Sequence, residues 1–147
     1  MGNITEKYIS CSEEETHNLG IQLARLMGPG TTVSLEGDLG AGKTALVKGI
    51  AKGLGIEDTI TSPTFTIVNT YEGDIKLHHF DVYRIDDPEE LYYIGWDEYF
   101  NTNDVCIVEW GDRVPQMLPA DAMHIRIMRD QAQLNKRTIF LERQDRS

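Results

Sequence analysis

The spacing of apolar residues predicts strands and helices along the 147-residue chain. After a Gly-Pro-Gly breaker, residues 31–35 (TTVSL) alternate apolar with polar side chains and are rich in β-branched residues, which predicts a strand. Residues 43–54 place apolar side chains three and four positions apart, which predicts a helix. An earlier helix is expected to begin at Ser12, because Ser12 and Glu15 have the spacing of a capping box. Its apolar stripe would comprise Leu19, Leu23, Leu26 and Met27.

The middle of the chain predicts three further strands and one further helix. Two strands are expected across a Glu-Gly-Asp turn, at residues 64–71 (TFTIVNTY) and 75–84 (IKLHHFDVYR). Asp87, followed by a proline and two glutamates, marks the expected start of a helix. Residues 105–108 (VCIV) are apolar throughout, as expected of a strand in the buried centre of a parallel sheet.

Two alternating segments near the end of the chain predict an antiparallel pair of strands at an edge of the sheet. They are MHIRIM at residues 123–128 and RTIFLE at residues 137–142. Together with the earlier elements they predict an α/β fold, with a mainly parallel central sheet flanked by helices. No linker or internal repeat interrupts residues 1–147, and this length suits a single domain.

A glycine-rich segment, EGDLGAGKT at residues 36–44, joins the predicted strand 31–35 to the predicted helix 43–54. It contains G-x-x-x-x-G-K-[ST], the phosphate-binding pattern of a P-loop. Glycines let successive backbone N–H groups turn inward around a polyphosphate, and the following helix adds the positive end of its dipole. The residues expected to bind the phosphates are Gly37, Asp38, Leu39, Gly40, Ala41, Gly42, Lys43 and Thr44. The pattern therefore predicts a single P-loop NTPase domain.

Two side chains of this pattern suit a nucleotide and its metal ion. Lys43 would bring a positive charge to the β- and γ-phosphates and take part in catalysis, and the Thr44 hydroxyl would ligate Mg²⁺. The N-K-x-D element that reads guanine in GTPases is incomplete, because residues 135–138 read NKRT. Without the aspartate, the guanine edge loses its main acceptor. The expected cofactors are therefore ATP and Mg²⁺.

A P-loop site also needs an acid at the end of another core strand, and two residues are candidates. Glu109 follows the apolar run VCIV and is the expected metal-side acid. Asp81 ends the less apolar run LHHFD and is expected to orient water or the metal, although the two roles could be exchanged. Trp110 is expected to pack behind Glu109 or to cap the crevice beside the nucleotide.

Three other features are weaker signals. Residues 61–64 (TSPT) lie where P-loop proteins place the segment that senses the γ-phosphate, but alone they read as an ordinary turn. Of the adjacent His78 and His79, one is expected to face inward as a hydrogen-bonded core residue and not as a metal ligand. The two cysteines, Cys11 and Cys106, lack metal spacing and are expected to be free thiols.

The charge of the chain limits its partners. Its formal net charge is -10, from 14 basic and 24 acidic residues. Proteins that bind nucleic acid unaided usually have a basic face, so tight direct binding of RNA or DNA is not expected. No apolar run approaches the ~20 residues of a membrane span, and the first ten residues do not resemble a signal peptide. The cytoplasm is the expected location.

Further motifs follow the P-loop in a fixed order. GDLGAGKT is followed by SPTF at residues 62–65, HFDVYR at 79–84, EEL at 89–91 and VEW at 108–110. In this order they resemble the bacterial ATPase family of tRNA threonylcarbamoyladenosine biosynthesis, the TsaE or YjeE type. The resemblance covers roughly residues 12–130.

The resemblance implies an ATPase that does not itself make the modified base. In this family a partner enzyme transfers the threonylcarbamoyl group to tRNA, and the ATPase binds that enzyme and its companion subunit and supports their turnover. The resemblance also implies that Thr44 and Glu109 hold Mg²⁺, that Asp81 supports hydrolysis and that Trp110 lies beside the nucleotide. Residues near Glu13 and Thr16 would approach the adenine.

Two other functions are compatible with a P-loop. A small-molecule kinase would need an arginine-rich acceptor pocket, which the sequence does not indicate. A nucleotide-dependent switch would bind ATP with negligible turnover. Spacing alone identifies no arginine finger; Arg84 and Arg113 are candidates, and a partner could supply one.

Overall fold

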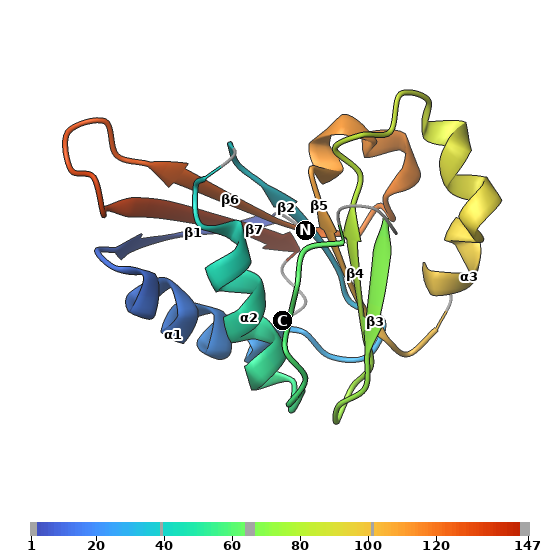
Figure 1. Cartoon of the computed structure of the whole chain (residues 1–147), viewed down its shortest axis with the longest axis horizontal. Coiled ribbons are helices and arrows are strands. Elements are labelled where there is room, and N and C mark those ends of the chain that lie inside the picture. Colours follow the sequence, from blue (N-terminus) through green and yellow to red (C-terminus); the bar gives the residue numbers. More distant parts are fainter. Residues whose placement is uncertain (1–2, 39, 64–66, 101, 145–147) are drawn as a thin grey trace.

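The computed structural model describes residues 3–38, 40–63, 67–100 and 102–144. Within these ranges seven strands form one sheet in the order β1-β7-β6-β2-β5-β4-β3 (Figure 1). The strands are β1 (Asn3–Ser10), β2 (Thr32–Glu36), β3 (Val68–Tyr71), β4 (Leu77–Asp81), β5 (Val105–Glu109), β6 (Met123–Arg129) and β7 (Arg137–Gln144). The helices are α1 (Glu13–Leu23), α2 (Lys43–Gly53) and α3 (Trp96–Phe100), with 3₁₀ segments η1 (Ala24–Leu26), η2 (Pro88–Ile94), η3 (Gly111–Arg113) and η4 (Pro115–Met117).

The centre of the sheet is parallel and its outer parts are antiparallel. β2 pairs in parallel with β5 and β6, and β4 pairs in parallel with β5. β3 is antiparallel to β4, β7 to β6 and β1 to β7. The predicted α/β class is confirmed. The centre of the sheet is parallel as expected, but the sheet as a whole is mixed, because antiparallel pairings lie on both sides of that centre.

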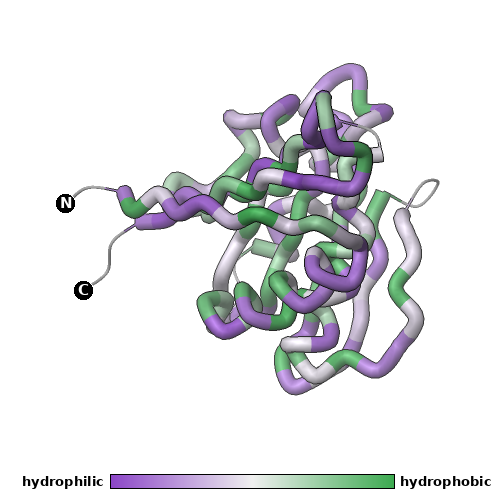
Figure 2. The backbone as a smooth tube through the Cα atoms, turned by 90° about the vertical axis from the view of Figure 1, so that its left-hand side faces the viewer, coloured by the Kyte–Doolittle hydropathy of each residue, from purple (hydrophilic) through white to green (hydrophobic). Residues whose placement is uncertain are grey.

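The antiparallel pair predicted near the C-terminus is present, but it is not the edge of the sheet. β7 pairs with β6 on one side and with β1 on the other, so β7 lies inside the sheet. The β1–β7 register runs from Asn3 opposite Gln144 to Ser10 opposite Arg137. Figure 2 shows that the end of this pair nearest the two chain termini extends from the body of the molecule. β1 gives a weak sequence signal because its residues, NITEKYIS, include few apolar side chains.

The segments predicted in the middle of the chain are shorter or differently coiled in the structure. β3 begins at Val68, and residues 64–66 of its predicted segment lie outside the described residues. β4 ends at Asp81 and does not continue to residue 84. The helix predicted at Asp87 is capped by that side chain but forms the 3₁₀ segment η2, and Gly95, with a φ of 79°, separates it from α3.

α1 begins as predicted, since the Ser12 side chain accepts a hydrogen bond from the Glu15 backbone N–H at 3.0 Å. Met27 is buried, but Leu26 is 39 % exposed, because α1 ends at Leu23 and the chain tightens into η1. α1 and α2 have 11 residues each, and no helix in the described ranges is long and apolar enough to cross a membrane.

Apolar side chains pack on both faces of the sheet. α1 and α2 lie side by side over one face (Figure 1), where they help to bury Leu35, Leu46, Ile50, Ile107 and Ile125. Their backbones approach closely at Gly49, where a Cβ would lie 2.0 Å from the carbonyl oxygen of His17. A second cluster that includes Phe80, Trp96 and Val108 packs η2 and α3 against the strands.

Candidate nucleotide-binding site

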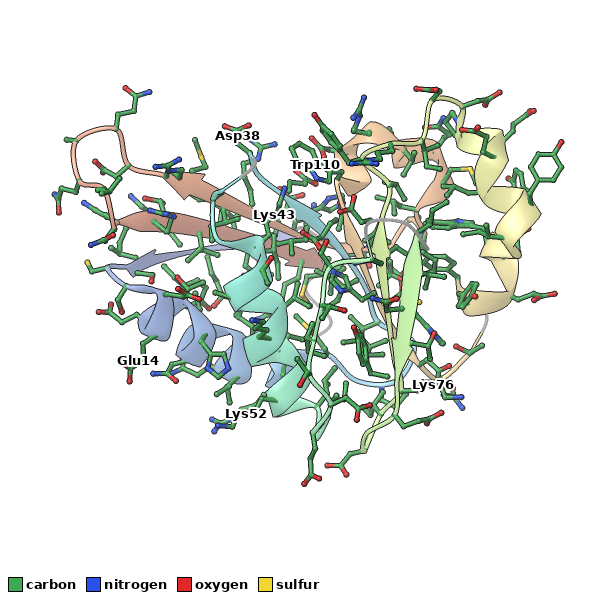
Figure 3. The ribbon with its side chains drawn as sticks, in the orientation of Figure 1. Glu14, Asp38, Lys43, Lys52, Lys76 and Trp110 are labelled. Carbon is green, nitrogen blue, oxygen red and sulfur yellow. The ribbon has the colours of Figure 1, made fainter. Side chains whose placement is uncertain are left out.

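The carboxyl ends of the parallel strands β2, β4 and β5 meet at one edge of the sheet, and a cavity of about 440 Å³ lies there. Figure 3 shows Asp38, Lys43 and Trp110 at this edge, whereas Lys52 and Lys76 lie at the opposite one. Open α/β sheets bind ligands outside the carboxyl ends of their strands. The cavity is therefore placed and sized for a small ligand.

Glycines with positive φ angles shape the glycine-rich loop at the cavity. The φ angles are 146° at Gly37, 78° at Gly40 and 104° at Gly42, a region that other residues rarely adopt. At Gly37 a side chain is also excluded by space, because a Cβ would lie 2.4 Å from the carbonyl oxygen of Ile127. α2 begins directly after Gly42, and its first turn borders the cavity.

The residues predicted to bind phosphates divide into two groups. Those that line the cavity are Gly40, Gly42, Lys43 and Thr44. Those that do not line it are Gly37, Asp38 and Ala41. Leu39 lies outside the described residues. The loop thus meets the cavity with its second half and with the start of α2.

The Lys43 ammonium group is held inside the site. Lys43 is only 6 % exposed, and its Nζ donates a hydrogen bond to the Gly37 carbonyl oxygen. The same Nζ lies 3.5 Å from the centroid of the Trp110 ring, a cation–π contact. Burial lowers the pKa of Lys43, and the negative charges of Glu109 and Asp81 oppose this shift. The lysine is therefore positioned among the groups that line the cavity.

Asp81 and Glu109 are register partners across β4 and β5, and each is the last residue of its strand. Glu109 is only 4 % exposed, and Asp81 is half-buried. Burial raises the pKa of Asp81; a hydrogen bond from the Tyr83 backbone N–H at 3.0 Å lowers it, and the nearby charge of Glu109 raises it. Asp81 therefore retains a proton more readily than an exposed aspartate does.

Both adjacent histidines of β4 are buried, although one was expected to face inward. His79 Nε2 lies 2.6 Å from Glu109 Oε2. His78 Nε2 lies 2.8 Å from Asp104 Oδ2 on the other face of the strand. Each histidine is therefore hydrogen-bonded to an acidic side chain, His79 to Glu109 and His78 to Asp104.

Trp110 borders the cavity because the chain turns sharply after β5. Trp110 has a φ of 64°, and its backbone N–H donates to the Leu35 carbonyl oxygen at 2.9 Å. This left-handed conformation ends the strand alternation after Glu109. The indole ring packs against Tyr83, with 4.7 Å between ring centroids, and lies beneath the Lys43 ammonium group.

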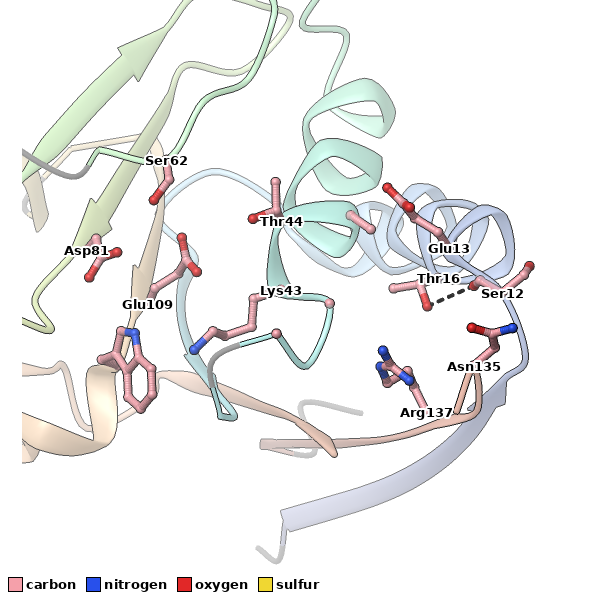
Figure 4. A pocket seen from close by; sticks show the side chains of 14 residues that line it. Ser12, Glu13, Thr16, Lys43, Thr44, Ser62, Asp81, Glu109, Asn135 and Arg137 are labelled. Atoms are coloured by element: carbon pink, nitrogen blue, oxygen red, sulfur yellow. Dashed lines mark hydrogen bonds between the residues drawn. The ribbon is translucent and has the colours of Figure 1, made fainter. Parts of the chain in front are cut away.

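The wall opposite the two acids comes from two segments that are far apart in the sequence (Figure 4). Its residues are Ser12, Glu13 and Thr16 at the start of α1, Asn135 in the turn between β6 and β7, and Arg137 at the start of β7. Arg137 Nε donates to the Ala41 carbonyl oxygen at 2.8 Å, which connects β7 to the glycine-rich loop. This wall carries hydroxyl, amide and charged groups suited to a polar ligand.

Comparisons with known proteins identify the family of the chain. The family model described as "Threonylcarbamoyl adenosine biosynthesis protein TsaE" matches residues 10–139. The chain belongs to the TsaE family. The matched range includes every described residue that lines the cavity, from Ser12 to Arg137.

Individual relatives also match most of the chain. The tRNA threonylcarbamoyladenosine biosynthesis protein TsaE of Bacillus subtilis is 44% identical over 84% of this chain and 77% of its own length. The protein of the same name from Treponema pallidum is 46% identical over 76% of this chain and 82% of its own length. The crystal structure of Bacillus subtilis YdiB superposes with a TM-score of 0.83 at 36% identity, covering 99% of this chain and 89% of that one.

Two residues of this TsaE-family cavity had no local sequence signal. Asn135 and Arg137 belong to the segment 135–138, whose sequence resembles only an incomplete guanine-reading element. Both line the cavity, because β7 pairs with β6 and the turn between them reaches the glycine-rich loop. Glu13 and Thr16, which the resemblance suggested, also line it.

Of the residues with weaker sequence signals, some line the cavity and others do not. In the segment 61–64, Ser62 lines the cavity, and the last residue lies outside the described part of the chain. Arg84 and Arg113 do not line it. In the described ranges, Arg137 is the arginine that does.

Proposed function

We propose that this TsaE-family chain is a Mg²⁺-dependent P-loop ATPase that supports tRNA threonylcarbamoyladenosine biosynthesis in the cytoplasm. The observation that carries the proposal is that Lys43 and Thr44 meet Asp81 and Glu109 around one cavity. A glycine-rich loop can bind phosphates without further chemistry. Acids on neighbouring strands add groups that can hold a metal ion and orient water, which phosphoryl transfer requires.

The donor atoms fit Mg²⁺. The cavity offers the Thr44 hydroxyl and the carboxylates of Asp81 and Glu109, all oxygen donors of the kind that Mg²⁺ prefers. Mg²⁺ usually takes one or two carboxylates and completes its coordination with phosphates and water, so it needs no cluster of three acidic or histidine ligands. We infer that Thr44 and Glu109 hold the ion. When bound, it would neutralise charge on the phosphates.

The shape of the cavity supports a nucleotide with its phosphates over the loop. The first turn of α2 and Lys43 would take the phosphates, at the positive end of the helix dipole. The nucleoside would then extend toward Ser12, Glu13, Thr16, Asn135 and Arg137, which form the opposite wall. We propose adenine as the base, because the aspartate of the guanine-reading element is replaced by Thr138.

The exposure of the two acids supports different roles. Asp81 is half-buried, and its raised pKa makes it a better proton acceptor from an attacking water than an exposed aspartate. Glu109 is almost completely buried and bonded to His79, which suits a group that must stay in one place beside the metal. Lys43 would offset the charge that develops on the γ-phosphate.

The family and the net charge of the chain support a proposal about its partners. We propose that the chain binds the threonylcarbamoyl-transferring enzyme and its companion subunit, and that ATP hydrolysis supports their turnover. With a net charge of -10, the chain would reach tRNA through these partners and not by direct tight binding. The names of the curated TsaE relatives support the pathway.

ATP turnover with and without the partner proteins tests the proposal. We expect the purified chain to release phosphate from ATP in the presence of Mg²⁺. This hydrolysis should stop when EDTA removes the ion and should become faster when the partner proteins are added. GTP should be a poorer substrate. Nucleotide binding without turnover in either condition would favour a switch, and phosphorylation of a metabolite by the chain alone would favour a kinase.

A further inference from the structure

Within the described ranges, His79 makes one short polar contact, and that contact is with Glu109. The His79 side chain is 2 % exposed, and its Nε2 lies 2.6 Å from Glu109 Oε2, whose side chain is 5 % exposed. Both residues lie on the face of the sheet that α2 covers, because His79 is a register partner of Ile107 in the buried cluster beneath α1 and α2. The pair is therefore closed off from water on the side away from the cavity.

The hydrogen bonds define the form of the imidazole ring. A carboxylate only accepts hydrogen bonds, so Nε2 must carry the hydrogen that bonds to Glu109. Nδ1 is buried and has no hydrogen-bond partner among the described residues. The geometry thus places a hydrogen on Nε2, which donates to Glu109 Oε2.

His78, the neighbouring residue, shows what a structural histidine looks like in the same strand. His78 Nδ1 lies 2.8 Å from Thr70 Oγ1, and its Nε2 lies 2.8 Å from Asp104 Oδ2, so both ring nitrogens are paired. His79 differs, because its Nδ1 has no partner among the residues that the structure describes, while its Nε2 is bonded to Glu109. A buried polar atom without a partner lowers stability, so the arrangement needs another reason.

We propose that His79 is a positioning residue that fixes the Glu109 carboxylate in the orientation needed beside Mg²⁺. The bond to Oε2 restrains the side chain and leaves Oε1 available for the ion or its water. This inference rests on the proposed Mg²⁺–ATP site. Hydrogen bonds that orient metal ligands typically contribute about 10- to 100-fold to metal affinity or activity, so the expected effect is large enough to measure.

Paired substitutions separate positioning from packing. His79→Leu removes the donor, whereas His79→Gln keeps an N–H donor near the position of Nε2. We expect His79→Leu to raise the Mg²⁺ concentration for half-maximal ATP binding by about 10-fold or more, and His79→Gln to stay within about threefold of the unmodified protein. ATP binding measured without Mg²⁺ should not change. His78→Leu, the matched control, should lower thermal stability and leave the Mg²⁺ dependence unchanged.

Side-chain ¹⁵N NMR of the histidines gives a readout that needs neither nucleotide nor activity. The unmodified protein should show a hydrogen on His79 Nε2, and Glu109→Ala should shift the His79 signals but not those of His78. An Nδ1–H tautomer, or signals insensitive to Glu109→Ala, would overturn the inference even if His79→Leu fails to fold.

The outcomes also distinguish this inference from the function on which it rests. If the unmodified chain binds ATP in a Mg²⁺-dependent way and folded His79→Leu retains the same Mg²⁺ dependence, the positioning role is wrong and the proposed function stands. If the unmodified chain shows no Mg²⁺-dependent ATP binding, both are wrong.

Discussion

The two side walls of the cavity differ in how firmly their side chains are held. On the wall formed by β4 and β5, Glu109 is only 4 % exposed and is bonded to a buried histidine. On the wall formed by α1 and the β6–β7 turn, Glu13 and Asn135 are exposed, and Arg137 is held by backbone carbonyl groups. Groups that act on a transition state need a fixed orientation, whereas a wall that only contacts a bound ligand can adjust to it. We call the wall formed by β4 and β5 the strand wall, and the wall formed by α1 and the β6–β7 turn the hairpin wall. Substitutions on the strand wall should therefore change the rate of ATP hydrolysis, and those on the hairpin wall should change the affinity for ATP.

The largest effect is expected at Lys43, which lies between the two walls. Lys43→Ala should reduce ATP hydrolysis by about 100-fold or more, because it removes the positive charge expected at the γ-phosphate. The fold should be kept, since the contacts of Nζ in the described part of the chain are those with the Gly37 carbonyl oxygen and the Trp110 ring. Phosphate release measures the rate of hydrolysis, and circular dichroism measures whether the fold is kept.

Lys48→Ala is the control for Lys43, because Lys48 is exposed on the same helix. Hydrolysis by Lys43→Ala at close to the normal rate would contradict the assignment of the loop to phosphate binding.

The next effect concerns the strand wall. Glu109→Ala and Asp81→Ala should each lower hydrolysis by at least about 10-fold, the scale of general acid–base and positioning effects. Glu109→Ala should also raise the Mg²⁺ requirement, whereas Asp81→Ala should lower turnover and leave ATP binding largely intact. Mg²⁺ titrations of both variants measure this difference, with Asp97→Ala on the exposed side of α3 as control. The opposite pattern would mean that the two acids exchange roles.

A smaller effect is expected on the hairpin wall. Arg137→Ala should weaken ATP binding by about tenfold, or ~1.4 kcal/mol, while kcat changes little. Calorimetric binding and steady-state kinetics separate the two. Arg143→Ala is a suitable control, because Arg143 lies on the same strand and pairs with Glu6 outside the cavity. A loss of kcat with unchanged affinity would show that this wall takes part in the reaction, and the contrast between the walls would fail.

The smallest effect is a pH dependence of stability at Asp81. Because the pKa of Asp81 is raised, the folded protein binds its proton more tightly than the unfolded chain does. Proton binding at Asp81 therefore adds to the free energy of unfolding below the ordinary aspartate pKa, and this stabilisation is lost as pH rises through the raised value. Asp81→Asn should therefore raise the melting temperature at pH 7, by no more than about 4 °C because the group is partly exposed. The difference should disappear near pH 4. A variant that melts lower than the unmodified protein at pH 7 would contradict this reasoning.

Sequence patterns predicted the parts of the site whose conformation depends on neighbouring residues. β2, the glycine-rich loop and α2 follow one another directly, and each carries its own signal in strand alternation, glycine spacing or helical spacing. The apolar run before Glu109 likewise marked β5, and Asp81 was chosen as the second acid because it ends the run LHHFD, although the strand was predicted to continue to residue 84. The sequence did not predict the partner of either acid, because that depends on which strands lie side by side.

The sequence by itself therefore determined the α/β class, the phosphate-binding pattern and the two candidate acids, since these follow from local propensity and chemistry. The tertiary structure alone decided that β1 forms the edge of the sheet, that Arg137 reaches the Ala41 carbonyl, and that His79 bonds to Glu109. Arg137 and Ala41 are 96 positions apart, and His79 and Glu109 are 30 apart. Contacts over such separations form only when strand order and register are set by the burial of the whole core, which no local pattern encodes.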